Sequence, residues 1–453
     1  MPAPLIVAKP VVFQKGNEME AASSVLSAPE GGLKKKIWQM YSQVPVLGWL
    51  CGALSAVLLE QFVGRPLALG LGLSKIPALF GFTIILKYPA LFPSALLYVF
   101  LIYLLPIIIV ARLSLAPTNW LAQKMMDYSM LGSVLVHLVL LYAIFHIWAG
   151  ISDYRDISLK FTLIAIMVTV SLNVINGYMG EFSCSHPGFM ALGAYTASVF
   201  SVSLFVNDSQ FGQALLPSFL GPFAFPLGLI LGGLVAAVGA LLVAIPSFRT
   251  RGDYLAIISL AFLFIVKSLV ENLEFVGGPR GLSSQPNWAN LPTVFAWTVA
   301  CIWVINNFVR STLGKALNAV RDDETAANAM TVNTRRTKMV AFMFAAFWAG
   351  VAGGLFAHVL RYVNPGSFGI QKLAEVLAMV YFGGLNSVYG SILGAVSLSL
   401  LGEALRPLEL FKWIVIPLLL ILVMIFRPTG LIAFKEFDVK KLIRPRQKPE
   451  NEV

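Results

Sequence analysis

The longest polar interruption in the apolar part of the sequence runs from residue 310 to residue 338. Ser311 and Thr312 are residue types that cap helices, and Asp323 can cap a second short helix. Between these caps, apolar residues recur at helical spacing on one face: Leu313, Ala316, Leu317 and Val320. Two short helices at a membrane surface would form a rigid projection with an apolar ridge for the groove of a partner. A partner that does mechanical work could push there.

An alternative for this segment is an amphipathic helix that lies on the lipid headgroups. The acidic residues Asp322, Asp323 and Glu324 argue against it, because anionic lipid would repel them. The segment is therefore predicted to dock a protein.

A second group of polar and glycine residues lies inside or beside apolar stretches of the sequence. Gly177 and Gly180 could let a helix unwind, and a helix end exposed inside a membrane can bind a charged group of a solute. The residues expected along such a path are Asn173, Asn176, Gly177, Gly180, Ser183, Ser185 and His186. The alternative is that they serve only helix packing, since glycine and serine favour the close approach of helices.

The sequence shows no pattern of an enzyme or of a metal site. Cys51, Cys184 and Cys301 lie in or beside apolar segments without metal-ligand spacing, so we expect reduced cysteines that fill space. The chain has no Gly-x-x-x-x-Gly-Lys-Ser/Thr phosphate loop, so ATP would have to be bound by another chain. No catalytic residue, metal or cofactor is expected.

The elements that position these residues are predicted from composition. Of 453 residues, 58% are apolar and only 12% are charged, which is about half the charged fraction of a soluble domain. A membrane-crossing helix needs roughly 20 apolar residues. Ten candidate spans meet this need: 44–63, 92–111, 131–150, 160–178, 187–206, 225–246, 253–270, 290–309, 339–359 and 411–427. Because helices satisfy their own backbone groups in lipid, the predicted fold is all-α, a polytopic transmembrane bundle.

The net charge of +11 is explained by orientation in the membrane rather than by nucleic acid. Basic residues gather before the first span, in alternate loops and after the last span, as expected on the cytoplasmic side. Both termini are therefore predicted to be cytoplasmic. This topology requires that residues 64–90 do not cross the membrane. It also requires that residues 376–402 do not form a single crossing.

The uncharged stretch 376–402 contains a turn-forming cluster at its middle, in which Gly383, Gly384 and Gly390 flank Asn386. Two short helices that meet at this turn would enter and return. Irregular backbone at that depth is tolerated only where protein or water covers it. We therefore predict a re-entrant hairpin near a translocation path, with Gly383, Gly384 and Asn386 beside it. The alternative is one long tilted span.

Several motifs occur in one order along the chain: 177–180, 189–195, 251–257, 277–282, 312–327 and 383–390. In this order they resemble LivM-type permeases of high-affinity branched-chain amino-acid importers, over about residues 160–430. Ser185 and Thr331 stand where the family usually has glycine, which puts the local turn geometry in question. Residues 1–155 show no comparable match.

The resemblance implies an ATP-driven importer in the bacterial inner membrane. In it, this chain would pair with a second, homologous permease subunit, two cytoplasmic ATPase subunits would dock on coupling loops, and a periplasmic binding protein would deliver the substrate. The ATPase-coupling residues would be Gly314, Arg321, Asp322, Asp323, Glu324, Thr325 and Ala326. The expected organisation is a cytoplasmic tail (1–42), an N-terminal membrane extension of about three spans (43–155), a permease core (156–430) and a cytoplasmic tail (431–453).

Three other functions make different demands on the sequence. An ion-coupled secondary transporter would place acidic residues in mid-membrane, whereas the acidic residues considered are predicted near span ends: Glu60, Glu271, Glu274, Glu375 and Glu403. A member of the same importer family could carry another small polar solute such as urea. A membrane scaffold without transport would leave the coupling-type segment unexplained.

Overall fold

The computed structural model describes residues 41–73, 76, 89–208, 210–248, 254–406, 409–427 and 429–445. The basic cluster at 34–36, the 251–253 part of one family motif and half of the loop between the first two predicted spans lie outside these residues.

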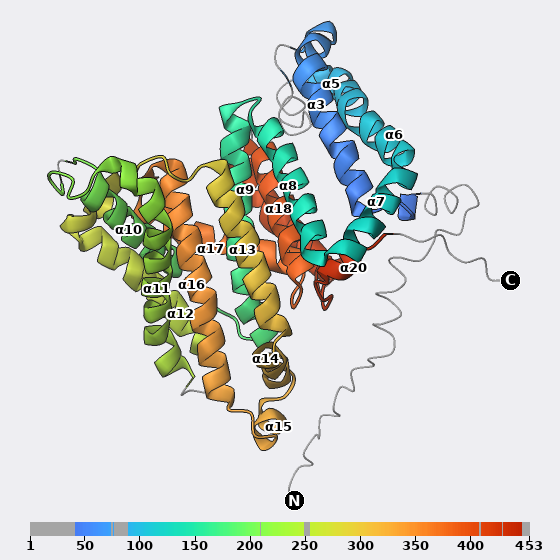
Figure 1. Ribbon diagram of the computed structural model, residues 1–453. Coiled ribbons are helices and arrows are strands. Elements are labelled where there is room, and N and C mark those ends of the chain that lie inside the picture. The colour runs from blue at the N-terminus through green and yellow to red at the C-terminus, as the bar shows by residue number, and fades with distance from the viewer. Residues whose placement is uncertain are drawn as a thin grey trace, which may run out of the picture.

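Nine helical segments among the described residues are long and apolar enough to cross a membrane (Figure 1). They are α3 (Val46–Gly70), α5–η3–α6 (Phe92–Val99, Phe100–Leu104, Leu105–Leu113), α8 (Met130–Ala149), α9–η4 (Asp153–Asn173, Val174–Met179), α10 (His186–Phe205), η5–α11 (Ser218–Leu220, Gly221–Ser247), α12 (Tyr254–Asn272), α13 (Leu291–Arg310) and α16 (Thr334–Leu360). All nine coincide with predicted spans. The tenth predicted span corresponds to α19 (Glu409–Phe426), whose apolar part Ile414–Phe426 is shorter than the other nine.

Short elements connect these helices. They are η2 (Pro89–Leu91), α7 (Leu115–Tyr128), η6 (Glu274–Val276), η7 (Gly278–Arg280) and η8 (Pro365–Phe368). The short helix α20 (Val439–Ile443) follows α19. The strands β1 (Leu282–Ser283) and β2 (Tyr362–Val363) pair antiparallel, with Leu282 opposite Val363. This pairing joins the start of α13 to the end of α16.

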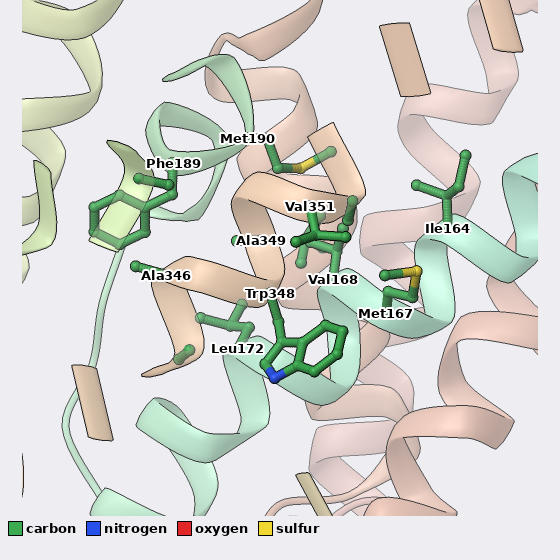
Figure 2. Close-up of a cluster of buried hydrophobic side chains, with 14 of the residues drawn as sticks. Ile164, Met167, Val168, Leu172, Phe189, Met190, Ala346, Trp348, Ala349 and Val351 are labelled. Atoms are coloured by element: carbon green, nitrogen blue, oxygen red, sulfur yellow. The ribbon is translucent and has the colours of Figure 1, made fainter. Parts of the chain in front are cut away.

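The core lies where α9, α10, α11 and α16 pack together. Small residues let the backbones of α10 and α16 approach closely, because a side chain at Gly193 would collide with the backbone of Gly350. Around this contact, Figure 2 shows Val168 and Leu172 of α9 packed with Trp348 and Val351 of α16. Buried residues make up 72% of the most apolar window of α9 and 67% of those of α10 and α16, so these three helices lie at the centre of the bundle.

Residues 370–404 form a helical hairpin, α17 (Ile370–Gly383) and α18 (Val388–Ala404). Between them the backbone reverses, with a φ of 126° at Gly384 and 55° at Asn386. A side chain at Gly383 would collide with the backbone of Gly390, so the two helices lie in close contact. The alternative of one long tilted span is therefore wrong. At 1.5 Å per residue the helices are about 21 and 26 Å long, shorter than the roughly 30 Å hydrocarbon layer, and re-entrance stays a prediction.

The N-terminal helices α3, α5, α6 and α7 form a separate group at one end of the molecule, drawn in blue and cyan in Figure 1. A buried ion pair attaches this group to the rest, because Arg155 at the start of α9 donates to both carboxylate oxygens of Glu60 at 2.8 and 2.9 Å. The prediction that Glu60 lies near a span end is wrong, since α3 continues to Gly70 and Glu60 is fully buried inside it.

Candidate translocation and coupling site

The segment after α13 folds into the two predicted short helices, α14 (Thr312–Asp322) and α15 (Glu324–Ala329), which project from one end of the bundle (Figure 1). The Ser311 hydroxyl accepts from the Gly314 N–H at 3.4 Å. The Asp323 carboxylate accepts from the N–H groups of Thr325 and Ala326 at 2.9 and 3.0 Å. Both caps are those predicted, because these contacts are local in sequence.

The exposed face of this projection is acidic rather than apolar. The residues from Asp322 to Ala326 are exposed. Leu317 and Val320, in contrast, are buried against the bundle. The prediction that these two residues belong to an apolar ridge for a partner's groove is therefore wrong. Their face of α14 packs against the bundle and anchors the helix there, so it is not available to a partner. A side chain at Gly314 would collide with the backbone of Val309, which holds the end of α13 against α14.

The end of α9 widens into the π-helix η4 and stops at Gly180, which has a φ of 76°. The sequence predicted unwinding near Gly177 and Gly180. In the structure, helical hydrogen bonding changes from Val174 onward, and the left-handed backbone occurs only at Gly180. This end of α9 is thus a break in the helix, and it lies next to both groups of predicted residues.

Asn173 fastens this break to the turn between α17 and α18. Its side-chain nitrogen lies 3.0 Å from the Ser387 carbonyl oxygen, 3.3 Å from the Gly384 carbonyl oxygen and 2.7 Å from the Ser391 hydroxyl. Its side-chain oxygen accepts from the Asn386 N–H at 3.1 Å. One carboxamide therefore bonds the Asn386 N–H and the Gly384 carbonyl oxygen of the turn, and also the Ser387 carbonyl oxygen, which accepts from the Ser391 N–H within α18 as well.

Arg321 of α14 covers the same break from the other side. A side chain at Gly177 would collide with Asn173 and Asn386, and one at Gly180 would collide with the Arg321 side chain. The Arg321 guanidinium lies 3.4 Å from the Gly177 carbonyl oxygen. These contacts place the projecting helices one side chain away from the contact between η4 and the hairpin turn.

Lys338, near the start of α16, makes a second connection. Its ammonium donates to Glu181, just after the break in α9, at 2.7 Å, and to Glu324 of α15 at 2.8 Å. Neither Lys338 nor Glu181 is among the site residues predicted from the sequence. Local spacing carries no signal for a contact between positions 157 residues apart.

The segment 430–434 also contacts the site. The N–H groups of Leu431 and Ile432 donate to the carbonyl oxygens of Phe382 and Gly383 at 3.1 and 2.9 Å. The Arg321 guanidinium lies 5.5 Å from the Phe434 ring. Residues assigned from sequence to the C-terminal tail thus support the hairpin turn.

The remaining predicted path residues form a buried cluster at the start of α10. Asn176 accepts from the Ser183 N–H at 3.3 Å, and the hydroxyls of Ser183 and Ser185 lie 2.9 Å apart. The His186 ring is fully buried, with its centroid 5.9 Å from that of Phe189. Cys184 lies between Ser183 and Ser185 in the chain, and burial raises the pKa of its thiol above the ordinary value. The predicted path residues therefore fall into two groups, one at the hairpin turn and one at the start of α10.

Nine long apolar helices in the described part of the chain, with a projecting two-helix element, define a multi-pass helical membrane protein. The chain belongs to the family described as "Branched-chain amino acid transport system / permease component", whose model matches residues 154–426, and it is a permease subunit. It is 33% identical to the high-affinity branched-chain amino acid transport system permease protein LivM of Escherichia coli (strain K12), over 314 residues that cover 62% of this chain and 70% of the relative.

Two more distant relatives widen the comparison. The LivH permease protein of the same transport system in Escherichia coli (strain K12) is 25% identical over 60% of this chain and 92% of the relative. The autoinducer 2 import system permease protein LsrC of Photorhabdus luminescens is 25% identical over 45% of this chain and 63% of the relative. No solved structure matches the chain significantly.

Proposed function

We propose that this chain is the membrane-spanning subunit of an ATP-driven importer that carries leucine, isoleucine and valine across the bacterial inner membrane. The observation that carries the proposal is the family match over residues 154–426, which include both groups of site residues, and the 33% identity to LivM supports it. Because LivH is also similar to this chain, we expect a second homologous permease subunit as its partner. Two ATPase subunits and a periplasmic binding protein complete the proposed complex, and this chain hydrolyses nothing itself.

The projecting helices α14 and α15 are the proposed docking point of an ATPase. Their exposed acidic residues would fit a basic groove, and force on α14 would reach the break in α9 through Arg321, which touches Gly177 and Gly180. Force on α15 would reach the same break through Glu324, Lys338 and Glu181. Movement there would loosen the contact between η4 and the hairpin turn and so open a path for solute.

The proposed orientation puts α14, α15 and both termini in the cytoplasm. It is supported by the exposed basic residues Lys315, Arg335 and Arg336 at that end of the bundle. The opposite end of the bundle, where α9 begins, then faces the periplasm.

A second candidate function is import of a different small polar solute. The relative LsrC, named for autoinducer 2 import, favours it, because the family is then not confined to amino acids. Urea is a further solute of this kind.

Uptake measurements decide between the two. Cells that express the complete complex should accumulate labelled leucine, isoleucine and valine, and cells that lack this chain should not. Accumulation of labelled urea or autoinducer 2, without the three amino acids, would favour the second function. Uptake that persists when cellular ATP is depleted but the ion gradients are maintained would contradict an ATP-driven importer.

A further inference from the structure

A cavity of about 150 Å³ lies between α9, α17 and α18, away from the coupling residues. One residue from each of three further helices completes its wall: Met190 of α10, Phe356 of α16 and Ile416 of α19. A cavity of comparable size in another protein accommodates benzene, so there is room for an aliphatic side chain.

The two ends of the cavity differ in polarity. Toward the start of α9 the lining carries Lys372, Glu375 and Glu403, and toward the middle of α9 it is formed by Val168 and Met379. Lys372 and Glu375 form an ion pair at 3.1 Å, with 19% and 38% of their side chains exposed. Glu403 accepts from the Tyr154 hydroxyl at 2.8 Å. The polar end thus presents one ammonium and two carboxylates beside an apolar floor.

The position of the cavity matches a solute that arrives from outside. Its lining residue Thr162 precedes Asn173 by 11 positions on α9, which is about 17 Å at 1.5 Å per residue. Between the cavity floor and the coupling helices lies the contact of Asn173 with the hairpin turn. In the proposed orientation, the cavity therefore lies on the periplasmic side of that contact.

We infer that this cavity binds a zwitterionic amino acid with an aliphatic side chain, on its way from the binding protein to the contact at Asn173. The inference rests on the proposed function. The ligand carboxylate would accept from Lys372, its ammonium would donate to Glu375 or Glu403, and its side chain would contact Val168 and Met379. Charged residues are costly within membrane-spanning protein and usually mark a solute path, and a mostly apolar cavity with a few convergent polar groups is the usual form of a ligand site.

Protection of an introduced cysteine tests this site directly. In the purified complex without binding protein, Ser399→Cys places a thiol in the cavity wall, and peptide mass spectrometry distinguishes its labelling from that of the three native cysteines. Saturating leucine should slow labelling by a small thiol reagent roughly tenfold or more, by mass action. Leucinamide, which lacks the carboxylate, and 4-methylpentanoate, which lacks the ammonium, should protect much less. Thr162→Cys serves as a second reporter if the first variant does not assemble.

A matched pair of charge variants completes the test. Lys372→Met should abolish protection by leucine, whereas Lys267→Met should leave it unchanged, because Lys267 forms a similar, partly exposed pair with Glu271 on α12. If the wild-type complex transports leucine but leucine protects neither reporter, the cavity inference is wrong and the proposed function stands. If leucine protects the reporter but cells take up none, the proposed function fails and the site stands. Equal protection by all three compounds would show that the charges do not select a zwitterion.

Discussion

At the scale of single residues, Asn173 is the position on which the arrangement of the site depends most. The turn between α17 and α18 places the Asn386 N–H and the Gly384 carbonyl oxygen outside the helical hydrogen bonds, and a carboxamide offers both an acceptor and a donor for them. Its side chain is buried, so water cannot replace it. Aspartate lacks the donors and leucine lacks both kinds of group.

We predict that Asn173→Leu destabilises the purified complex by about 1–3 kcal/mol, because buried polar groups of the turn lose their partner. The change should be measured as a shift in the midpoint of unfolding in sodium dodecyl sulfate. Asn272→Ala is the matched control, since Asn272 is exposed and donates only to Ser268 in its own helix; it should change stability by less than about 0.5 kcal/mol. Equal losses of stability in the two variants would show that the hydrogen bonds of Asn173 do not stabilise the complex more than those of an exposed asparagine.

At the scale of elements, α16 connects the two functional ends of the core. Near its start Lys338 joins α15 to the break in α9, and near its end Phe356 lines the cavity. Lys338 is buried and holds two carboxylates that belong to different elements, Glu181 and Glu324. Without its ammonium these two carboxylates would repel each other, and the link between α15 and α9 would open.

We predict that Lys338→Met lowers the amount of solute imported per ATP hydrolysed severalfold while the ATPase subunits stay bound. The physical reason is that every side chain of the docking face from Asp322 to Ala326 is kept, and only the ion pairs that connect Glu324 to Glu181 through Lys338 are lost. Uptake and ATP hydrolysis should be measured together in reconstituted vesicles. Lys338→Arg should restore the ratio, and Arg336→Gln, which removes an exposed charge two residues away, should not alter it. An unchanged ratio in Lys338→Met would exclude this connection.

Local patterns in the sequence predicted the elements well and their contacts poorly. The spans, the caps at Ser311 and Asp323 and the turn at Gly384 follow from hydrogen bonds and apolar periodicity within a few residues. The direction in which Leu317 faces depends on what the bundle offers it, which no local pattern records. The same holds for the ion pair of Lys338 with Glu181, whose partners meet only after the helices have packed.

At the scale of the whole molecule, the N-terminal helices are an addition to the family core. The family match begins at residue 154, so Arg155 belongs to the matched part and Glu60 does not. Around their ion pair, the hydroxyls of Tyr98 and Tyr103 donate to Glu60, and the Arg155 guanidinium lies 5.0 Å from the Trp148 ring. This network fixes the added helices to the start of α9, the same end of α9 that lines the cavity.

Removing one partner of this pair should cost far more than removing both. Arg155→Met leaves the Glu60 carboxylate buried without a cation, which typically costs about 3–5 kcal/mol, whereas Glu60→Leu combined with Arg155→Met replaces the pair by apolar contacts and should recover most of the loss. Unfolding in sodium dodecyl sulfate of the single and double variants measures both effects. Lys267→Met, which breaks the partly exposed pair with Glu271, should cost no more than about 1 kcal/mol. If the single and double variants are equally stable, the unpaired Glu60 carboxylate costs nothing. The added helices would then be held by their apolar contacts and not by the ion pair.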